Sequence, residues 1–280
     1  MSTRDMSNQE ANHSLVVVAG LGEVGMPLLN ILSRIYDCVG VDLTPVEIDR
    51  PCSVLHLCYP FQIRNFIAIS ADYVAKYQPQ LTMIHSTVAP GTTRELQQAT
   101  ATERIVFSPI RGKHARMESD MLHYKKFVAA SSAEIAQQAA SHFAQAGFKT
   151  DIFPTPEVGE LSKLVETTYL GILVGWAQEI ERFANRYGGS AEDVNAFIEE
   201  IDYLPHHIFP GHIGGHCVMP NIEILRNHLN SRFLDAVVES NELKRKQLSS
   251  NSNWKQTNSV SAEAGLLQGE ARATKYATGN

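Results

Sequence analysis

The chain has 280 residues, of which 44% are hydrophobic and 19% charged, with a formal net charge of −6. This composition is that of one or two globular domains, and the acidic balance disfavours nucleic acid or an anionic membrane surface as a partner. Because the first fourteen residues are polar and no apolar run approaches the roughly 20 residues that span a bilayer, we expect a cytoplasmic protein.

Apolar, β-rich runs alternate with helical segments over the first half of the chain. Strands are predicted over Leu15–Ala19, Cys38–Val41, Val54–Cys58, Leu81–His85, Ile105–Ser108 and Phe127–Ala130. Helices are predicted over Met26–Tyr36, Ala71–Tyr77, Thr92–Thr100 and Ala133–Ala146. This alternation predicts an α/β domain with a doubly wound parallel sheet over residues 14–156, after a disordered leader over 1–13.

The second half of the chain changes character after Pro156. Val158–Tyr187 carries an apolar stripe at helical spacing, which predicts one long helix that ends at Gly188-Gly189. Ser190 is expected to cap the following helix, and Ile222–Leu248 is predicted to be helical. We expect an all-helical domain over residues 157–248 and a disordered tail over 249–280.

A glycine-rich turn follows the first strand and opens a helix. It reads Gly20-Leu21-Gly22-Glu23-Val24-Gly25, a spacing that lets a dinucleotide pyrophosphate approach the helix N-terminus. Asp42 stands at the end of the next strand, where a carboxylate binds ribose hydroxyls and repels a 2′-phosphate, which favours NAD over NADP. The alternative is a structural turn that binds nothing.

One thiol lies in a second glycine-rich segment, Phe209–Pro220. There Cys217 follows His216, and it is either a nucleophile or a buried bystander. Cys38, Cys52 and Cys58 lie in or beside apolar strand runs and are interpreted as core thiols. No pair of cysteines has the spacing of a structural zinc site, so we expect no metal.

These motifs together resemble the nucleotide-sugar dehydrogenases, the UDP-glucose and GDP-mannose 6-dehydrogenases. The matching segments are Gly20–Gly25, His85–Thr93, Ser108-Pro109, Glu160–Lys163 and Phe209–Pro220. The resemblance implies a Rossmann domain followed by a helical domain, with NAD as the cofactor. It also implies oxidation of a sugar primary alcohol to an aldehyde, which a cysteine traps and a second hydride transfer converts to a thioester.

The resemblance assigns roles to particular residues. Cys217 would be the nucleophile, Lys163 would stabilise the developing oxyanions, and Ser86 and Thr87 would lie beside the nicotinamide, with Thr87 positioning a water. An imidazolium at His216 or a nearby ammonium would lower the pKa of the Cys217 thiol. The family's long helix also pairs two subunits, so a homodimer through residues 158–187 is expected.

Three residues depart from the family pattern. Ile110 stands where the family has Glu, Thr167 where it has Asn, and Asn221 where it has Asp. The chain also ends in the tail instead of a second nucleotide-binding domain. We therefore expect slow thioester hydrolysis, and either another substrate or a reaction that stops at a two-electron step. Two alternatives stay open: a two-electron β-hydroxyacid-type dehydrogenase that uses Lys163, and a catalytically silent NAD-binding or assembly protein.

Two further clusters have open interpretations. His206, His207, His212 and His216 crowd one loop, where they could supply an acid or base near neutral pH, bind a metal ion with a non-standard ligand spacing, or simply pack the loop. The basic run Arg111–Arg116 could contact a phosphate or carboxylate of a small-molecule substrate, or be a solvated face.

Overall fold

The computed structural model describes residues 15–42 and 46–250. These residues form two compact units that divide between Lys163 and Leu164, called here the sheet unit and the helical unit. The predicted leader over 1–13 lies outside the described residues, as does the predicted tail from residue 251 onward. The first two residues of that tail, Ser249 and Ser250, belong to the last helix.

The sheet unit is built on a five-stranded parallel sheet with the order β2-β1-β3-β4-β5. The strands are β1 (Leu15–Ala19), β2 (Cys38–Val41), β3 (Cys52–Leu57), β4 (Leu81–Ile84) and β5 (Ile105–Phe107). All five were predicted to within two residues at each end. Crossover helices separate most of them, so the predicted α/β architecture with a doubly wound parallel sheet is confirmed.

The sixth predicted strand lies in a separate sheet. β6 (Lys126–Val128) pairs in parallel with β7 (Thr150–Ile152), a strand that the sequence analysis missed. The residue after β6, Ala129, makes only an isolated antiparallel bridge to Phe107. β7 was missed because it is three residues long and only partly buried, so it lacks the apolar run that signals an inner strand.

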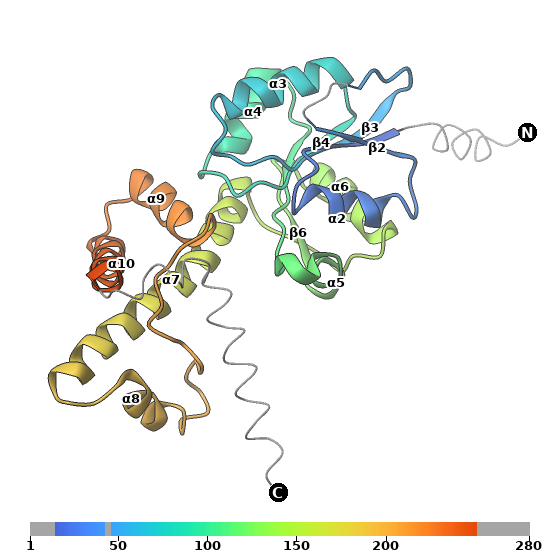
Figure 1. Ribbon diagram of the computed structural model, residues 1–280. Helices are drawn as coiled ribbons and strands as arrows, with labels where there is room; N and C mark the ends of the chain where they lie inside the picture. Colours follow the sequence, from blue (N-terminus) through green and yellow to red (C-terminus); the bar gives the residue numbers. More distant parts are fainter. Residues whose placement is uncertain (1–14, 43–45, 251–280) are drawn as a thin grey trace, which may run out of the picture. The chain divides into compact units, whose positions relative to one another are not determined.

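Helices cover both faces of the main sheet (Figure 1). α2 (Gly25–Leu32), α5 (Met117–His123) and α6 (Ala133–Gln145) pack with Val16 and Val18 of β1 on one face. α3 (Phe66–Tyr77) and α4 (Thr92–Thr100) pack with Leu15, Val17 and Ala19 on the other. Successive side chains of β1 therefore pack into two different cores, one on each face of the sheet. This is expected of an inner strand with both faces buried.

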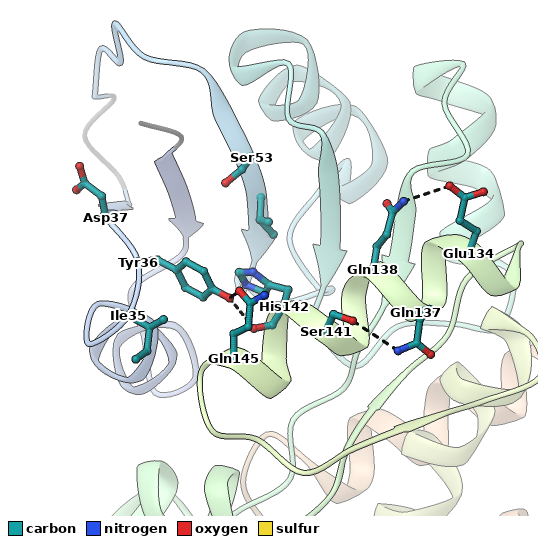
Figure 2. A pocket seen from close by; sticks show the side chains of 11 residues that line it. Ile35, Tyr36, Asp37, Ser53, Glu134, Gln137, Gln138, Ser141, His142 and Gln145 are labelled. Carbon is teal, nitrogen blue, oxygen red and sulfur yellow. Dashed lines mark hydrogen bonds between the residues drawn. The ribbon is translucent and has the colours of Figure 1, made fainter. Parts of the chain in front are cut away.

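A pocket of about 650 Å³ opens at the amino-terminal edge of this sheet. Tyr36 and Asp37 before β2 and Ser53 in β3 form one wall, and Gln138 and His142 of α6 form another (Figure 2). The Tyr36 ring stacks on His142, with centroids 4.6 Å apart. The pocket therefore lies at the sheet edge opposite the glycine-rich turn.

The helical unit contains most of α7 (Pro156–Arg186), then α8 (Ala191–Ile198), α9 (Val218–His228) and α10 (Arg232–Ser250). A capping box starts α8, because Ser190 and Asp193 each accept a hydrogen bond from the other's backbone N–H, which confirms the predicted cap. The single helix predicted over 222–248 is wrong: extended backbone at Leu229 divides it into α9 and α10. Among the described residues, we find no helix long and apolar enough to cross a membrane.

Candidate functional site

The carboxyl edge of the main sheet brings together residues that are far apart in the sequence. Backbone hydrogen bonds continue one residue beyond each strand: Gly20 N to Val41 O, Cys58 N to Ala19 O, His85 N to Leu57 O, and Ser108 N to Ile84 O. The edge therefore reads Asp42, Gly20, Cys58, His85, Ser108 across the five strands. Ligands of open parallel sheets bind at this edge where the strand order reverses, which here is between β1 and β3.

The three glycines of the turn have different structural reasons to be glycine. Gly20 has a φ of 90°, and a Cβ there would lie 2.7 Å from the backbone nitrogen of Tyr59. A Cβ on Gly25 would lie 1.7 Å from the carbonyl oxygen of Gly20, so α2 could not approach β1 as it does. A Cβ on Gly22 would meet no described atom within 4 Å. The protein's own packing does not explain Gly22, whereas close approach of a ligand does.

Asp42 and the remaining turn residues stand at the same edge. Asp42 is exposed and directly follows Val41, which is in register with Ala19, so its carboxylate stands one strand away from the turn. Glu23 pairs with His114 at 3.2 Å, and Val24 directly precedes α2. An exposed carboxylate one strand away from an open Gly22 fits a dinucleotide ribose and pyrophosphate.

A buried carboxylate holds the segment after β4. The Glu160 side chain is fully buried in α7 and accepts hydrogen bonds from the backbone N–H of Gly91 at 2.7 Å and of Thr93 at 2.8 Å, and from the Thr93 hydroxyl at 2.6 Å. Burial raises the pKa of Glu160, and these three hydrogen bonds oppose that rise. Glu160 thereby occupies the N-terminus of α4 and links the matched segment His85–Thr93 to the matched segment Glu160–Lys163.

Ser86 and Thr87 directly follow His85 at the same edge of the sheet. Ser86 is buried and its hydroxyl donates to the carbonyl of Tyr59, while Thr87 is half-buried between buried neighbours. Lys163 is half-buried, and its charge is one of the causes that lower the pKa of Lys126, after burial and the charge of Arg111. Within the sheet unit, the predicted cofactor residues therefore gather at one edge, and Lys163 lies near a second, buried lysine.

The residues after Ser108-Pro109 serve packing. Ile110, which stands in place of the family's Glu, belongs to the core beneath α2 and α6. In the basic run, the Arg111 guanidinium lies over the rings of Tyr124 and Phe127 at 5.6 and 5.2 Å, and Arg116 pairs with Asp120 at 3.0 Å. Arg111 and Arg116 of this run therefore contact side chains of the sheet unit itself.

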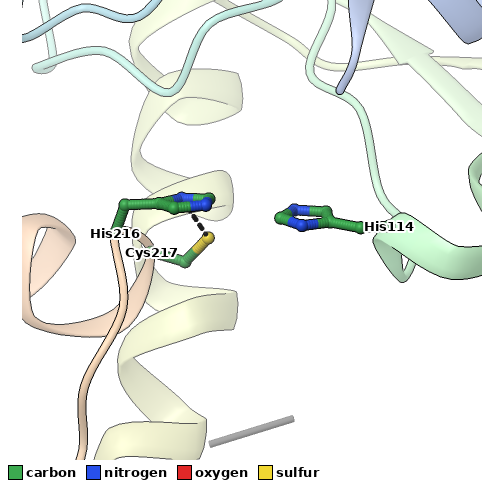
Figure 3. Close-up of side chains that lie close together, drawn as sticks. All are labelled: His114, His216 and Cys217. Atoms are coloured by element: carbon green, nitrogen blue, oxygen red, sulfur yellow. Dashed lines mark hydrogen bonds between the residues drawn. The ribbon is translucent and has the colours of Figure 1, made fainter. Parts of the chain in front are cut away.

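Cys217 lies at the first turn of α9 in the helical unit. It is the residue before the helix begins, it is half-buried, and Gly215 two residues earlier has a φ of 75°. The thiol Sγ lies 3.2 Å from Nδ1 of the exposed His216 (Figure 3). The thiol therefore lies at a helix N-terminus with an imidazole nitrogen within hydrogen-bonding distance. In contrast, burial raises the pKa of both Cys52 and Cys58 to about 12, so these are inert core thiols as expected.

Asn221 and Thr167, two of the residues that depart from the pattern of the resembled family, form a hydrogen bond with each other. The Asn221 side-chain amide donates to the Thr167 hydroxyl at 2.8 Å, and the Asn221 backbone N–H donates to the Cys217 carbonyl. Asn221 is buried, with an exposed fraction of 3%. A neutral amide–hydroxyl pair therefore stands one helical turn from the thiol.

The loop histidines are spread along the helical unit. His206 bonds the carbonyl of Ile201, and His207 pairs with Glu199 at 3.4 Å near the end of α8. Burial lowers the pKa of His212, which lies near Glu242 and Arg245 of α10. His216 contacts the candidate nucleophile, whereas His206 and His207 contact residues at the end of α8, so the four histidines do not share one partner.

Sequence reasoning missed a buried polar cluster in the sheet unit. His56 of β3, His142 of α6 and Lys126 of β6 join His85, and all four side chains are at least nine-tenths buried. A signal was available, because His56 lies between Leu55 and Leu57 in β3, and His85 directly follows the buried strand β4. The partners on α6 and β6 have no such signal.

The chain is similar to dehydrogenases in sequence and in fold. The family model described as "UDP-glucose/GDP-mannose dehydrogenase family, central domain" matches residues 157–243. The UDP-glucose 6-dehydrogenase of Campylobacter jejuni is 24% identical over 172 residues, which is 59% of this chain and 44% of that protein. The chain thus spans less than half the length of this curated relative.

Two solved structures share the fold. The UDP-D-ManNAc dehydrogenase of Pyrococcus horikoshii has a TM-score of 0.74 at 18% identity, covering 84% of this chain and 70% of its own. The 3-hydroxyisobutyrate dehydrogenase of Mycobacterium tuberculosis has a TM-score of 0.64 at 12% identity, covering 91% of this chain and 99% of its own. At these identities the likeness establishes the fold. In sequence, residues 157–243 are similar to the central domain of the UDP-glucose/GDP-mannose dehydrogenase family.

Proposed function

We propose that this protein is an NAD-dependent dehydrogenase that oxidises a primary alcohol of a sugar or nucleotide-sugar substrate through Cys217. The observation that carries the proposal is the carboxyl edge of the sheet, where the open Gly22 and the exposed Asp42 stand on neighbouring strands at the switch point. The family match over residues 157–243 supports the reaction class.

The cofactor residues would be Gly20, Gly22, Glu23, Val24 and Gly25 at the turn, with Asp42, Ser86 and Thr87. Bound NAD would supply the hydride acceptor. Asp42 would accept hydrogen bonds from the adenosine ribose, and its negative charge disfavours a 2′-phosphate. We therefore expect tighter binding of NAD than of NADP, and we expect Asp42→Ala to narrow that difference in calorimetric titrations.

The substrate chemistry would fall to Cys217, His216 and Lys163. His216 would take the thiol proton across the 3.2 Å contact, and the Cys217 thiolate would attack the aldehyde carbon to form a thiohemiacetal. The Lys163 ammonium would stabilise the oxyanion, and Thr87 would position a water. Because the neighbouring pair Asn221–Thr167 offers an amide and a hydroxyl instead of a carboxylate, we expect slow hydrolysis of the thioester.

The test counts NADH per substrate molecule over a panel of sugars, UDP-sugars and small alcohols. Two NADH per turnover, lost in Cys217→Ser and kept in Cys38→Ser, would support the thioester route. Intact-mass spectrometry of quenched reactions should show an acyl adduct that is absent from Cys217→Ser. Cys38 is the matched control because it is also half-buried, and burial raises the pKa of its thiol.

A second candidate is a two-electron dehydrogenase of the β-hydroxyacid type. The fold likeness that covers 99% of the M. tuberculosis 3-hydroxyisobutyrate dehydrogenase favours it, as does the neutral Asn221–Thr167 pair. One NADH per turnover, abolished by Lys163→Ala and little changed by Cys217→Ser, would select this candidate. NAD binding without turnover of any panel member would select a silent NAD-binding protein.

We propose that the protein is a homodimer through α7. Large apolar side chains on this helix are exposed at helical spacing, among them Val165, Tyr169, Trp176 and Phe183. Such a stripe is typical of a subunit interface. Light scattering at micromolar concentration should give twice the chain mass, and a monomer would exclude the proposal. We also place the protein in the cytoplasm, which fits its four free thiols.

A further inference from the structure

Four buried titratable side chains of the sheet unit form one hydrogen-bonded chain. His142 Nε2 lies 3.2 Å from His56 Nε2, and His56 Nδ1 lies 2.8 Å from His85 Nε2. His85 Nδ1 in turn lies 3.2 Å from the amine of Lys126. The four residues come from α6, β3, the end of β4 and β6, so only the tertiary structure joins them.

The two ends of this chain have different surroundings. His142 lines the pocket at the amino-terminal edge of the sheet and stacks on the Tyr36 ring (Figure 2). Lys126 lies at the other end, where His85 directly precedes Ser86 and Thr87. The chain therefore runs across the sheet unit from a pocket to the edge that carries the candidate cofactor residues. Burying three imidazoles and one amine costs desolvation free energy, and apolar side chains would fill the same space without that cost. We therefore infer that these groups have a role beyond packing.

The contacts at Lys126 favour a resting proton on His85 Nδ1, and the Lys126 ammonium is the state formed when a further proton arrives. The Lys126 amine donates to the carbonyls of Ser108 at 2.6 Å and Pro109 at 2.9 Å. With a third hydrogen it is an ammonium whose remaining donor faces His85 Nδ1. His85 Nδ1 also lies 2.6 Å from the Ser108 carbonyl, which only accepts. The proton can thus sit on Nδ1 and bond Ser108, leaving the amine neutral.

We propose that His142, His56 and His85 form a proton relay that connects the pocket with the amine of Lys126. In the outward pass, the Lys126 ammonium gives a proton to His85 Nδ1, and His85 Nε2 gives its proton to His56 Nδ1. His56 Nε2 then gives its proton to His142 Nε2, and His142 Nδ1 releases one to pocket water. One proton leaves Lys126 and one reaches water, while each imidazole ends neutral in its other tautomer. The reverse pass restores the starting tautomers.

The surroundings favour this exchange over stable charging. Burial, above all, lowers the pKa of His56, His85 and Lys126, and burial lowers the pKa of His142 to about 4. The cationic form of each imidazole is therefore disfavoured. A proton that enters the row of histidines is transferred onward instead of being retained on one ring. The use of the relay in alcohol oxidation, which releases one proton for each hydride transferred, rests on the proposed function.

The direct test is hydrogen exchange of the imidazole N–H groups in the full chain labelled with ¹⁵N-histidine. The exchange rate of the His56 and His85 N–H groups is divided by that of the backbone amides of β3, which reports local opening. We expect His142→Phe to lower this ratio by about tenfold or more, because positioned acid–base transfer contributes factors of about 10². An unchanged ratio would overturn the relay. Tyr36→Phe is the matched control, since it keeps the stacked ring and should leave the ratio unchanged.

Chemical rescue separates proton transfer from packing. In His142→Ala, added imidazole should restore the ratio, whereas 1-methylimidazole, which fills similar space but lacks an N–H, should not. Equal rescue by both compounds would overturn the relay.

A single-turnover measurement then tests its use in catalysis. In His142→Phe, proton release to a pH indicator should lag behind NADH formation, whereas in wild type the two should coincide. Coincidence in the variant would overturn this use. If no panel alcohol yields NADH, the proposed function fails while the exchange ratio still decides the relay.

Discussion

The buried histidines predict that acid destabilises the sheet unit before any other part of the described chain. The perturbation is a change from pH 7 to pH 5. An unfolded histidine has a pKa of about 6.5, whereas burial holds the pKa of His142 at about 4 and those of His56 and His85 well below their ordinary value. A lowered folded pKa means that the unfolded state binds more protons, so stability is complete above about pH 6.5 and falls below it.

The magnitude follows from the same values. At pH 5 an unfolded imidazole is about 97% protonated and the folded His142 about 10%, which costs about 2 kcal/mol of unfolding free energy between pH 7 and pH 5. If all three histidines stay neutral when folded, the limiting slope is about 4 kcal/mol per pH unit. Domain stabilities are only about 5–15 kcal/mol, so the sheet unit should be close to unfolding at pH 5. Burial raises the pKa of Glu160, which acts in the opposite sense and reduces the observed loss.

Hydrogen exchange read by mass spectrometry can follow this locally. Protection of β3 peptides, corrected for the pH dependence of chemical exchange, should fall steeply from pH 7 to pH 5, and peptides of α9 serve as an internal reference. His142→Gln should reduce the slope by about one proton, or about 1.4 kcal/mol per pH unit. His228→Gln, an exposed histidine of α9, should leave it unchanged. Equal protection of β3 at pH 7 and pH 5 would contradict the predicted loss of stability in acid.

Three further predictions concern individual side chains. Gly22→Ala should fold normally and lose NAD affinity in calorimetry, whereas Gly25→Ala should lower the melting temperature. The reason is that a Cβ at position 25 meets protein atoms and a Cβ at position 22 does not. Equal melting temperatures of the two variants would contradict this. Glu160→Gln should cost about 2–4 kcal/mol in denaturant unfolding because an amide nitrogen would face N–H donors, while Glu157→Gln, which removes only a partly exposed pair with Arg94, should cost less than about 1 kcal/mol. Ser190→Ala should cost about 1 kcal/mol through the cap of α8 and should raise amide exchange at the start of that helix, and unchanged exchange there would contradict the capping box.

Patterns of neighbouring residues were sufficient to predict an element where a short apolar run or a single turn forms it. The five strands of the main sheet are short apolar runs, and both their bounds and the glycine turn after the first were predictable. The α8 cap was predictable too, because Ser190 and Asp193 are three residues apart and a capping box involves only neighbouring backbone. The break at Leu229 was not, since apolar periodicity continues on both sides of it.

The amino-acid sequence therefore predicted the alternation of strands and helices, which the fold confirms. Which polar groups meet depends on the tertiary structure. The tertiary structure places Glu160 at the N-terminus of α4 and pairs Asn221 with Thr167. It also joins His142, His56, His85 and Lys126 into one buried hydrogen-bonded row. Hydrogen bonds act over about 3 Å, while these partners are 29 to 86 residues apart, so no pattern along the chain encodes the contact.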